Sequence, residues 1–276
     1  MIINGREISS KILEDLKQRV EKLKEKNVIP HLYIILLSND PSSQSYVKQK
    51  MLKAEQIGVK ITIEEESFEE SQNKLLEKIE RLNNDKFVHG IIVQRPMPET
   101  FDEKTIVKAI SPLKDVDGFN SDSKFKAPIG QAVLKLLKSS HPDNFDQWLK
   151  QQKITVLGNG LTAGTPIINT LISADIKPEV VTSGTENKEE ILKKSDIVIS
   201  AVGKPDIINS FDLKKDVILI GVGIHKEKDG KFHGDFNEEK IQNIASFYTP
   251  TPGGVGPVNV SFLLKNLVEA CENQSI

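Results

Sequence analysis

Residues 154–166 have the sequence ITVLGNGLTAGTP, an apolar run that leads through a glycine-rich turn into a predicted helix over 165–174. This order of strand, turn and helix is typical of dinucleotide-binding folds, where a helix N-terminus faces a pyrophosphate. Gly158 and Gly160 would let the backbone approach the pyrophosphate, and Gly164 would let the helix pack on the sheet. The spacing is GxGxxxG rather than GxGxxG, so a purely structural turn is the alternative.

Strand and helix patterns alternate on both sides of this segment. The predicted strands cover 31–38, 87–94, 154–158, 179–183, 196–203 and 216–223. Amphipathic helices are predicted between them, and a final helix over 258–271 is expected to fold back on the first lobe. Such alternation predicts parallel sheets covered by helices. Two series separated near residues 119–150 predict an α/β fold of two lobes with a cleft between them.

Composition narrows the class of protein. The chain has 276 residues, a formal net charge of −2 and 5% aromatic residues, which argues against nucleic acid as a partner. Cys271 is the single cysteine, so no intrachain disulfide is expected. The apolar runs are too short to span a membrane, and the N-terminus lacks a signal-peptide pattern. A cytoplasmic protein without a membrane partner is therefore expected.

Several polar residues occupy positions that often hold catalytic or ligand-binding groups in α/β folds. Tyr46 and Lys50 are four residues apart in a predicted helix and share one face. Gln94 ends a predicted strand, and ligands bind at those ends. Asp115 and Asp117 lie in the segment KDVDGF. Taken singly, each has an ordinary reading, because surface helices carry solvated lysines and Asp-Gly is a common turn.

The segment YTPTPGGVGPVNV at 248–260 is rich in proline and glycine, which predicts a rigid ligand-contacting loop rather than a plain connector. The histidines show no metal-ligand spacing and are expected to be structural or exposed, so no metal is predicted. These histidines are His31, His89, His141, His225 and His233.

Five segments, taken in order, resemble one family. They are SNDPSSQSYVKQKMLKAEQIGV, GIIVQRPMP, KDVDGF, AVGKP and TPTPGGVGPV, within a resemblance that runs from about residue 1 to 272. The family is the bifunctional methylenetetrahydrofolate dehydrogenase/methenyltetrahydrofolate cyclohydrolase, whose second segment has the pattern GxxVQLPLP. Several motifs in the right order are more specific than any single motif.

The resemblance implies site residues. The implied catalytic group is Lys50, Tyr46, Gln94 and Asp117, with Lys50 as the catalytic lysine, Gln94 orienting it and Asp117 binding the pterin. The implied substrate-binding group is Ser43, Tyr46, Asp117, Pro252, Gly253 and Gly254. The implied cofactor-binding group is Gly158, Asn159, Gly160, Gly164, Ser183 and Ile224. The resemblance implies NADP as the cofactor. Asn159 stands where the family has an arginine that meets a 2′-phosphate, so NAD is kept as an option.

By this resemblance the chain oxidises 5,10-methylenetetrahydrofolate with a nicotinamide cofactor and hydrolyses the methenyl product to 10-formyltetrahydrofolate, in the one-carbon metabolism that serves purine biosynthesis. A folate-binding catalytic domain would comprise residues 1–120 and 254–276, and a Rossmann-type domain residues 121–253. A homodimer is implied. The alternatives are a cyclohydrolase with weak dehydrogenase activity, which the altered turn would favour, a non-catalytic folate-binding relative and, remotely, a two-lobe dehydrogenase similar to shikimate dehydrogenase.

Overall fold

The computed structural model describes residues 1–37, 41–65, 71–227 and 230–274, except for the side chains of residues 41–43 and 45. The chain forms two compact units. One comprises residues 10–128 and 260–276 and is called here the three-stranded unit; the other comprises residues 1–9 and 129–259 and is called the five-stranded unit. The limits predicted from the sequence divide the chain at different residues.

A parallel sheet of order β2-β1-β3 organises the three-stranded unit. Its strands are β1 (His31–Leu36), β2 (Lys60–Glu65) and β3 (Gly90–Gln94). Its helical residues come from α1 (Gly5–Glu25), α2 (Pro41–Ile57), α3 (Gln72–Asn84), α4 (Glu103–Ala109) and α10 (Val255–Gln274).

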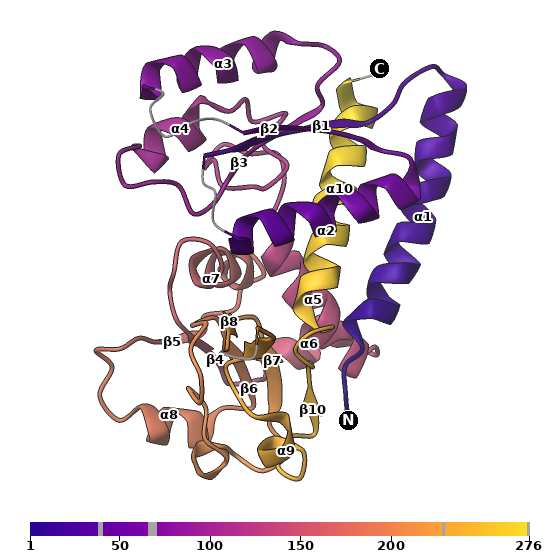
Figure 1. Cartoon of the computed structure of the whole chain (residues 1–276). Coiled ribbons are helices and arrows are strands. Elements are labelled where there is room, and N and C mark those ends of the chain that lie inside the picture. The colour runs from indigo at the N-terminus through magenta and orange to yellow at the C-terminus, as the bar shows by residue number, and fades with distance from the viewer. Residues whose placement is uncertain (38–40, 66–70, 228–229, 275–276) are drawn as a thin grey trace. The chain divides into compact units, whose positions relative to one another are not determined.

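Helices cover both faces of this sheet (Figure 1). Leu32 and Ile34 of β1 pack in one core with apolar residues of α1, α2 and α10, whereas Ile35 packs in another with residues of α3 and α4. Side chains alternate along a strand, so one apolar run supplies both cores. Leu263 and Leu267 of α10 are buried in the first core, which confirms that the last helix folds onto this part of the chain.

The five-stranded unit contains a parallel sheet of order β10-β7-β6-β4-β5. Its strands are β4 (Ile154–Leu157), β5 (Glu179–Val181), β6 (Ile197–Ser200), β7 (Ile218–Gly221) and β10 (Phe247–Tyr248). Its helices are α5 (Pro128–Ser140), α6 (Phe145–Lys150), α7 (Gly164–Ile172), α8 (Lys188–Lys194), η1 (Ser210–Asp212) and α9 (Glu238–Ile241). The strand order reverses direction at β4, as in doubly wound nucleotide-binding folds.

Two small features complete the five-stranded unit. The strands β8 (Ile224–Lys226) and β9 (Phe232–Gly234) form an antiparallel hairpin. At the other end of the sheet, Ile2 bridges Tyr248, and the Tyr248 N–H donates to the Met1 carbonyl at 3.0 Å. The first residues of the chain thus extend the β10 edge.

These sheets confirm the α/β fold expected from the alternating pattern. The pattern missed β2, the hairpin β8–β9 and the two-residue strand β10. It also made β6 too long, because the predicted strand 196–203 ends at Ser200 and Gly203 turns the chain with φ +73°. None of the helices in the described part of the chain has the length and apolar content that a membrane crossing requires.

Candidate active site

Lys50 lies inside the three-stranded unit rather than on its surface. It projects from α2 with only 2% of its surface exposed, and its Nζ donates a 2.9 Å hydrogen bond to Oε1 of Gln94. Gln94 is the last residue of β3 and is also buried. On the same helix Lys48 is exposed and Lys53 is half-buried. Of these three nearby lysines, only Lys50 is fully buried.

Tyr46 lies one helical turn before Lys50, and its ring centroid is 5.0 Å from Lys50 Nζ. A cation at this distance over an aromatic ring is attracted to it. Ser43 lies in α2 as well, but its side chain is outside the described part of the structure.

The surroundings of Lys50 weaken its hold on a proton. Burial lowers the pKa of the ammonium, and the charge of Asp117 opposes that shift. Gln94 has a fixed orientation, because its Nε2 donates to the carbonyl of Arg95 at 2.8 Å. The amide oxygen is thereby held toward Lys50. A lysine in such a position gives up its proton more readily than a solvated lysine.

Asp117 sits in the loop between Lys114 and Asn120. It is half-buried and precedes Gly118, whose φ of +68° favours glycine. A Cβ on Gly118 would lie 2.7 Å from the Ala127 nitrogen. Asp115 anchors the loop from inside by accepting the Asn120 N–H at 2.8 Å, and burial raises the pKa of its carboxyl to about 6.

Arg95 is a charged neighbour that the sequence analysis did not select. Its guanidinium lies 3.5 Å from the centroid of the Phe119 ring and forms a 2.7 Å ion pair with Glu103. It thus links the end of β3 to the loop that carries Asp117. The signal in the sequence was the arginine in VQRPMP, where the family pattern has leucine.

The glycine-rich turn of the five-stranded unit has the shape of a dinucleotide cradle. Gly158 follows β4 with φ +88°, and a Cβ there would lie 2.7 Å from the Ala201 carbonyl oxygen. A Cβ on Gly164, at the start of α7, would lie 2.1 Å from the Gly158 oxygen. Gly160 is exposed and has open space around its missing side chain, and Asn159 is exposed beside it. The turn therefore fits close approach of a phosphate group.

The remaining cofactor residues lie in the same unit. Ser183 is exposed just after β5, where the Thr182 N–H donates to Oγ1 of Thr185 at 2.9 Å. Ile224 begins β8 and is 53% exposed. Its carbonyl oxygen lies near Gly203, where a Cβ would be 3.1 Å away.

The predicted folate loop lies at residues 252–254 of the five-stranded unit. Gly253 has φ +117°, and Gly254 is so close to Gly5 that a Cβ on Gly5 would lie 1.8 Å from the Gly254 oxygen. Pro252 follows a cis peptide bond. The loop is thus packed against the chain's own N-terminal segment, which leaves no space for a side chain at Gly5, and a Cβ on Gly254 would lie 2.7 Å from the Pro250 oxygen.

In the part of the chain that the structure describes, histidines and acidic side chains do not assemble a metal centre. Within residues 1–37, 41–65, 71–227 and 230–274, no group of three or more His, Cys, Asp or Glu side chains could hold an ion. His225 and His233 face each other across the hairpin with ring centroids 6.1 Å apart. His31 makes contacts with the Phe87 oxygen and with Thr62 Oγ1 at 3.0 and 2.8 Å.

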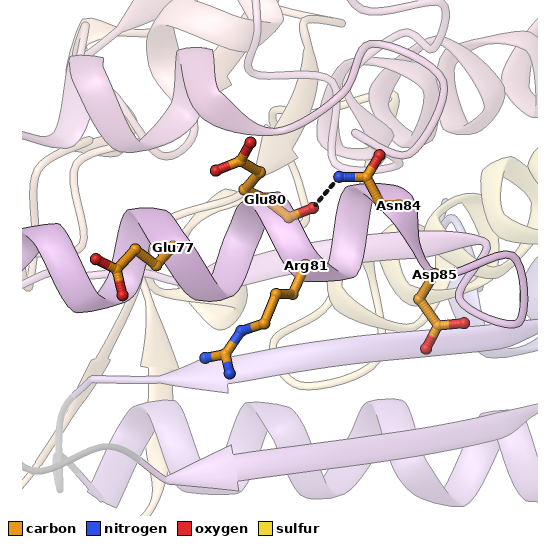
Figure 2. Close-up of a pocket in the computed structure, with 5 residues that line it drawn as sticks. All are labelled: Glu77, Glu80, Arg81, Asn84 and Asp85. Atoms are coloured by element: carbon orange, nitrogen blue, oxygen red, sulfur yellow. Dashed lines mark hydrogen bonds between the residues drawn. The ribbon is translucent and has the colours of Figure 1, made fainter.

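A hollow of about 510 Å³ lies elsewhere, on the surface of α3 (Figure 2). Its lining comes from Glu77, Glu80, Arg81, Asn84 and Asp85. Figure 2 shows the Nδ2 group of Asn84 donating to the Glu80 carbonyl within the helix, at 3.0 Å. Neither the Lys50 group nor the glycine-rich turn lines this hollow, so it is separate from the candidate site.

Comparison with known proteins matches both units to one family. Residues 3–117 match the tetrahydrofolate dehydrogenase/cyclohydrolase catalytic domain, and residues 128–275 match the NAD(P)-binding domain of the same family. The chain is 37% identical to the bifunctional protein FolD of Oceanobacillus iheyensis, over 98% of this chain and 96% of the relative.

Solved structures show the same likeness. The bifunctional FolD methylenetetrahydrofolate dehydrogenase/cyclohydrolase of Campylobacter jejuni superposes with a TM-score of 0.92 at 32% identity, covering 99% of each chain. The Trypanosoma brucei enzyme, solved with NADP cofactor and inhibitor, gives a TM-score of 0.91 at 29% identity, covering 100% of this chain and 98% of that one.

Proposed function

Because the chain belongs to the tetrahydrofolate dehydrogenase/cyclohydrolase family, we propose that it catalyses both reactions of that family. It oxidises 5,10-methylenetetrahydrofolate to the methenyl form with NADP, or with NAD, and hydrolyses the methenyl form to 10-formyltetrahydrofolate. The match to bifunctional relatives over nearly the whole chain does not favour a folate binder without activity.

The observation that carries this proposal is the buried Lys50–Gln94 hydrogen bond, with Tyr46 and Asp117 beside it. A protein that only bound folate would gain nothing from burying a lysine, because burial of an ammonium costs free energy. A catalyst that must remove a proton near neutral pH gains a base of lowered pKa.

Hydrolysis assigns a task to each residue of this group. Neutral Lys50 takes a proton from the water that attacks the methenyl carbon. The new C–O bond first gives an adduct that carries a hydroxyl on the former methenyl carbon. The hydroxyl then loses its proton as the formyl C=O forms and the bond from that carbon to N5 breaks, and N5 retains the electron pair and takes a proton. Gln94 holds the Lys50 amine in line with the water, and Tyr46 packs beside it. Asp117 accepts N–H groups of the pterin, which orients the reacting carbon.

Oxidation uses the five-stranded unit. A nicotinamide dinucleotide bound to this unit would supply the hydride acceptor for the methylene carbon. Gly158, Gly160 and Gly164 admit the pyrophosphate, since a side chain at Gly158 or Gly164 would collide with backbone. Asn159 and Ser183 offer uncharged hydrogen-bonding groups toward the ribose end. Ile224 supplies an exposed apolar surface for the nicotinamide.

The folate contacts assigned to Ser43 and to the loop Pro252, Gly253 and Gly254 belong to the same proposal, as do a homodimer, a cytoplasmic location and a place in the supply of one-carbon units for purines. The family resemblance supports them. The oligomeric state is measured by light scattering during size-exclusion chromatography, where a monomer at assay concentration contradicts the dimer.

The central test replaces Lys50. We expect Lys50→Met to lower the rate of methenyltetrahydrofolate hydrolysis by at least about 100-fold, because general-base catalysis supplies a factor of that order. Loss of methenyl absorbance above the spontaneous rate measures it, and oxidation with NADP and NAD is followed in parallel on the wild-type protein.

Lys48→Met is the matched control, since Lys48 is exposed on the same helix. It should hydrolyse like the wild type. A Lys50→Met protein that remains folded and hydrolyses at the wild-type rate would remove Lys50 from the catalytic group. Hydrolysis by the wild type without oxidation by either cofactor would contradict the dehydrogenase half alone.

A further inference from the structure

Asp235, directly after β9, is a fully buried carboxylate with no role in the function proposed above. Its Oδ1 accepts the N–H groups of Gly203 and Lys204 at 2.7 and 3.0 Å. Its Oδ2 accepts the Val202 N–H at 3.0 Å and the Ser200 hydroxyl at 2.5 Å. Three successive backbone N–H groups therefore converge on one internal anion, the arrangement called a nest.

The surrounding backbone makes further contacts with Asp235. Its own carbonyl accepts the N–H groups of Ile207 and Ile208 at 3.0 and 3.3 Å. A Cβ on Gly223 would lie 2.2 Å from Oδ2, so the chain after β7 presses directly on the carboxylate. Asp235 therefore makes hydrogen bonds along the whole loop that follows β6, from residue 200 to residue 208.

That loop lies at the edge of the sheet where a dinucleotide binds in doubly wound folds. The strand order turns back at β4, so the switch point lies outside the carboxyl ends of β4 and β6. The loop after β6 touches the glycine-rich turn after β4, because a Cβ on Gly158 would lie 2.7 Å from the Ala201 oxygen. On its other side Gly203 approaches the backbone of Ile224.

We propose that Asp235 is a positioning residue for dinucleotide binding, acting through the loop 201–204; the inference rests on the dehydrogenase half of the proposed function. The carboxylate accepts the three N–H groups of the nest from inside the protein. It thereby fixes the position of the loop between the glycine-rich turn and Ile224. Without it, three N–H groups lose their acceptor and the loop rearranges to reach water. The binding edge then loses its shape while the Lys50 group, in the other unit, is unaffected.

The test compares Asp235→Asn and Asp235→Ala with Asp196→Asn. Asp196 comes directly before β6, at the end of that strand opposite the loop 201–204. It accepts the Lys153 N–H at 2.8 Å and pairs with Lys214, so it is a matched carboxylate away from the switch point. Three quantities are measured: the Kd of NADPH by its fluorescence, the rate of methenyl hydrolysis, which uses no dinucleotide, and hydrogen exchange of the backbone amides.

We expect the Kd of NADPH to rise about ten-fold in Asp235→Asn and further in Asp235→Ala, because an amide retains one acceptor oxygen and a methyl group retains none. Amides 202–204 should exchange faster in both variants. Hydrolysis should stay within about two-fold of wild type, and Asp196→Asn should match wild type in all three quantities.

Two results would overturn the inference. One is an unchanged Kd in folded Asp235→Asn whose amides 202–204 exchange faster, since the loop would then move without affecting binding. The other is an equal rise of Kd in Asp196→Asn, which would indicate general loss of stability. If Asp235→Ala does not fold, Asp235→Asn decides alone. A wild-type protein that hydrolyses the methenyl substrate but binds no NADPH or NADH would instead contradict the dehydrogenase proposal itself.

Discussion

Lys50 and Lys48 have the same chemistry and differ in their surroundings. The α2 helix turns Lys50 toward the end of β3, where its amine meets Gln94, and leaves Lys48 in water. Burial acts on the charged form of the side chain, so the pKa of Lys50 is lowered. The rate of hydrolysis should therefore rise with pH through the titration of Lys50 and then level off, since the neutral amine is the base.

Gln94 should influence the pH at which the rate of hydrolysis rises. Replacing it by glutamate, which has nearly the same shape, places a negative charge at the oxygen now 2.9 Å from Lys50 Nζ. The charge favours the ammonium, so we expect the midpoint of the pH–rate profile to move up by about one unit or more. Hydrolysis at pH 7 should fall accordingly. The profile is measured from methenyl absorbance in buffers of constant ionic strength.

Gln56→Glu is the control for Gln94→Glu. Gln56 accepts from Lys53 Nζ at 3.4 Å on the outside of α2, so the same change occurs beside a lysine that is not buried. Its pH profile should coincide with that of the wild type. If the profile of Gln94→Glu also coincided, Lys50 would not be the group that titrates.

Burial also explains why the sequence indicated some of the site residues and missed others. Lys50 and Gln94 were identified through motifs, and the structure joins them by a hydrogen bond. Arg95 and Asp235 were missed, because an arginine after a strand and an aspartate after a glycine are common in surface segments. Only the folded chain shows that Arg95 stacks on Phe119 and that Asp235 is fully buried under three backbone N–H groups.

At the scale of elements, the loop 114–120 is held from several sides. Asp115 accepts the Asn120 N–H, and Asn120 donates to the carbonyl of Ile110 at 2.9 Å. Asn266 of α10 donates to the Val116 carbonyl at 2.8 Å. Asp117 therefore projects from a rigid loop, and its position depends on backbone contacts more than on its own side chain.

Gly118 is where this loop is most sensitive. Gly118→Ala forces a residue with φ +68° to carry a Cβ that lies 2.7 Å from the Ala127 nitrogen. We expect a loss of stability of about 1–3 kcal/mol from the backbone conformation and the collision. We also expect slower methenyl hydrolysis, because Asp117 is displaced. Urea unfolding and the hydrolysis assay measure the two effects.

Gly230→Ala separates the cost of the backbone conformation from the cost of the collision. Gly230 has φ +81° but open space around its missing side chain, so only the conformational cost applies. This variant should lose less stability than Gly118→Ala and keep full hydrolysis. Equal hydrolysis rates in both variants would mean that the position of the loop does not matter for Asp117.

Element prediction succeeded where burial is strong. The apolar runs of β1, β4 and β6 stand out because these strands are covered on both faces. β2 is an edge strand whose residues are partly exposed, so KITIEE lacks a continuous apolar run. The hairpin β8–β9 has strands of three residues, too short to show a period.

For the whole molecule, we expect the pH dependence of stability to reflect two neighbouring histidines, His31 at the start of β1 and His89. Burial lowers the pKa of His89 to about 4, below its ordinary value of 6.5, and lowers that of His31 as well. The unfolded chain takes up these protons near pH 6.5 and the folded chain does not, so stability falls as the pH drops from about 6.5 toward 4. Asp115, with a pKa raised to about 6, acts in the opposite direction.

His89→Gln isolates the contribution of His89. Glutamine can still accept the His31 N–H that Nδ1 of His89 now accepts at 3.2 Å, but it does not titrate. We expect the Tm of this variant to fall less than that of the wild type between pH 7 and pH 4.5. Differential scanning calorimetry at several pH values measures the two slopes.

His141→Gln provides the comparison, because the His141 ring stacks on Trp148 with centroids 4.0 Å apart and does not belong to the His31–His89 pair. Its Tm should follow the wild-type pH dependence. Parallel slopes for His89→Gln and the wild type would show that His89 does not control acid unfolding.

The division of the chain has a consequence for its synthesis. Residues 1–9 belong with residues 129–259, and residues 260–276 belong with residues 10–128. While the ribosome is still translating, the β10 edge that pairs with Met1 and Ile3 has not been made, and the core around β1 lacks Leu263 and Leu267. Neither unit can be completed from one uninterrupted stretch of sequence. The nascent chain therefore cannot finish one unit before starting the other, and a gene cut between the units would encode two incomplete ones.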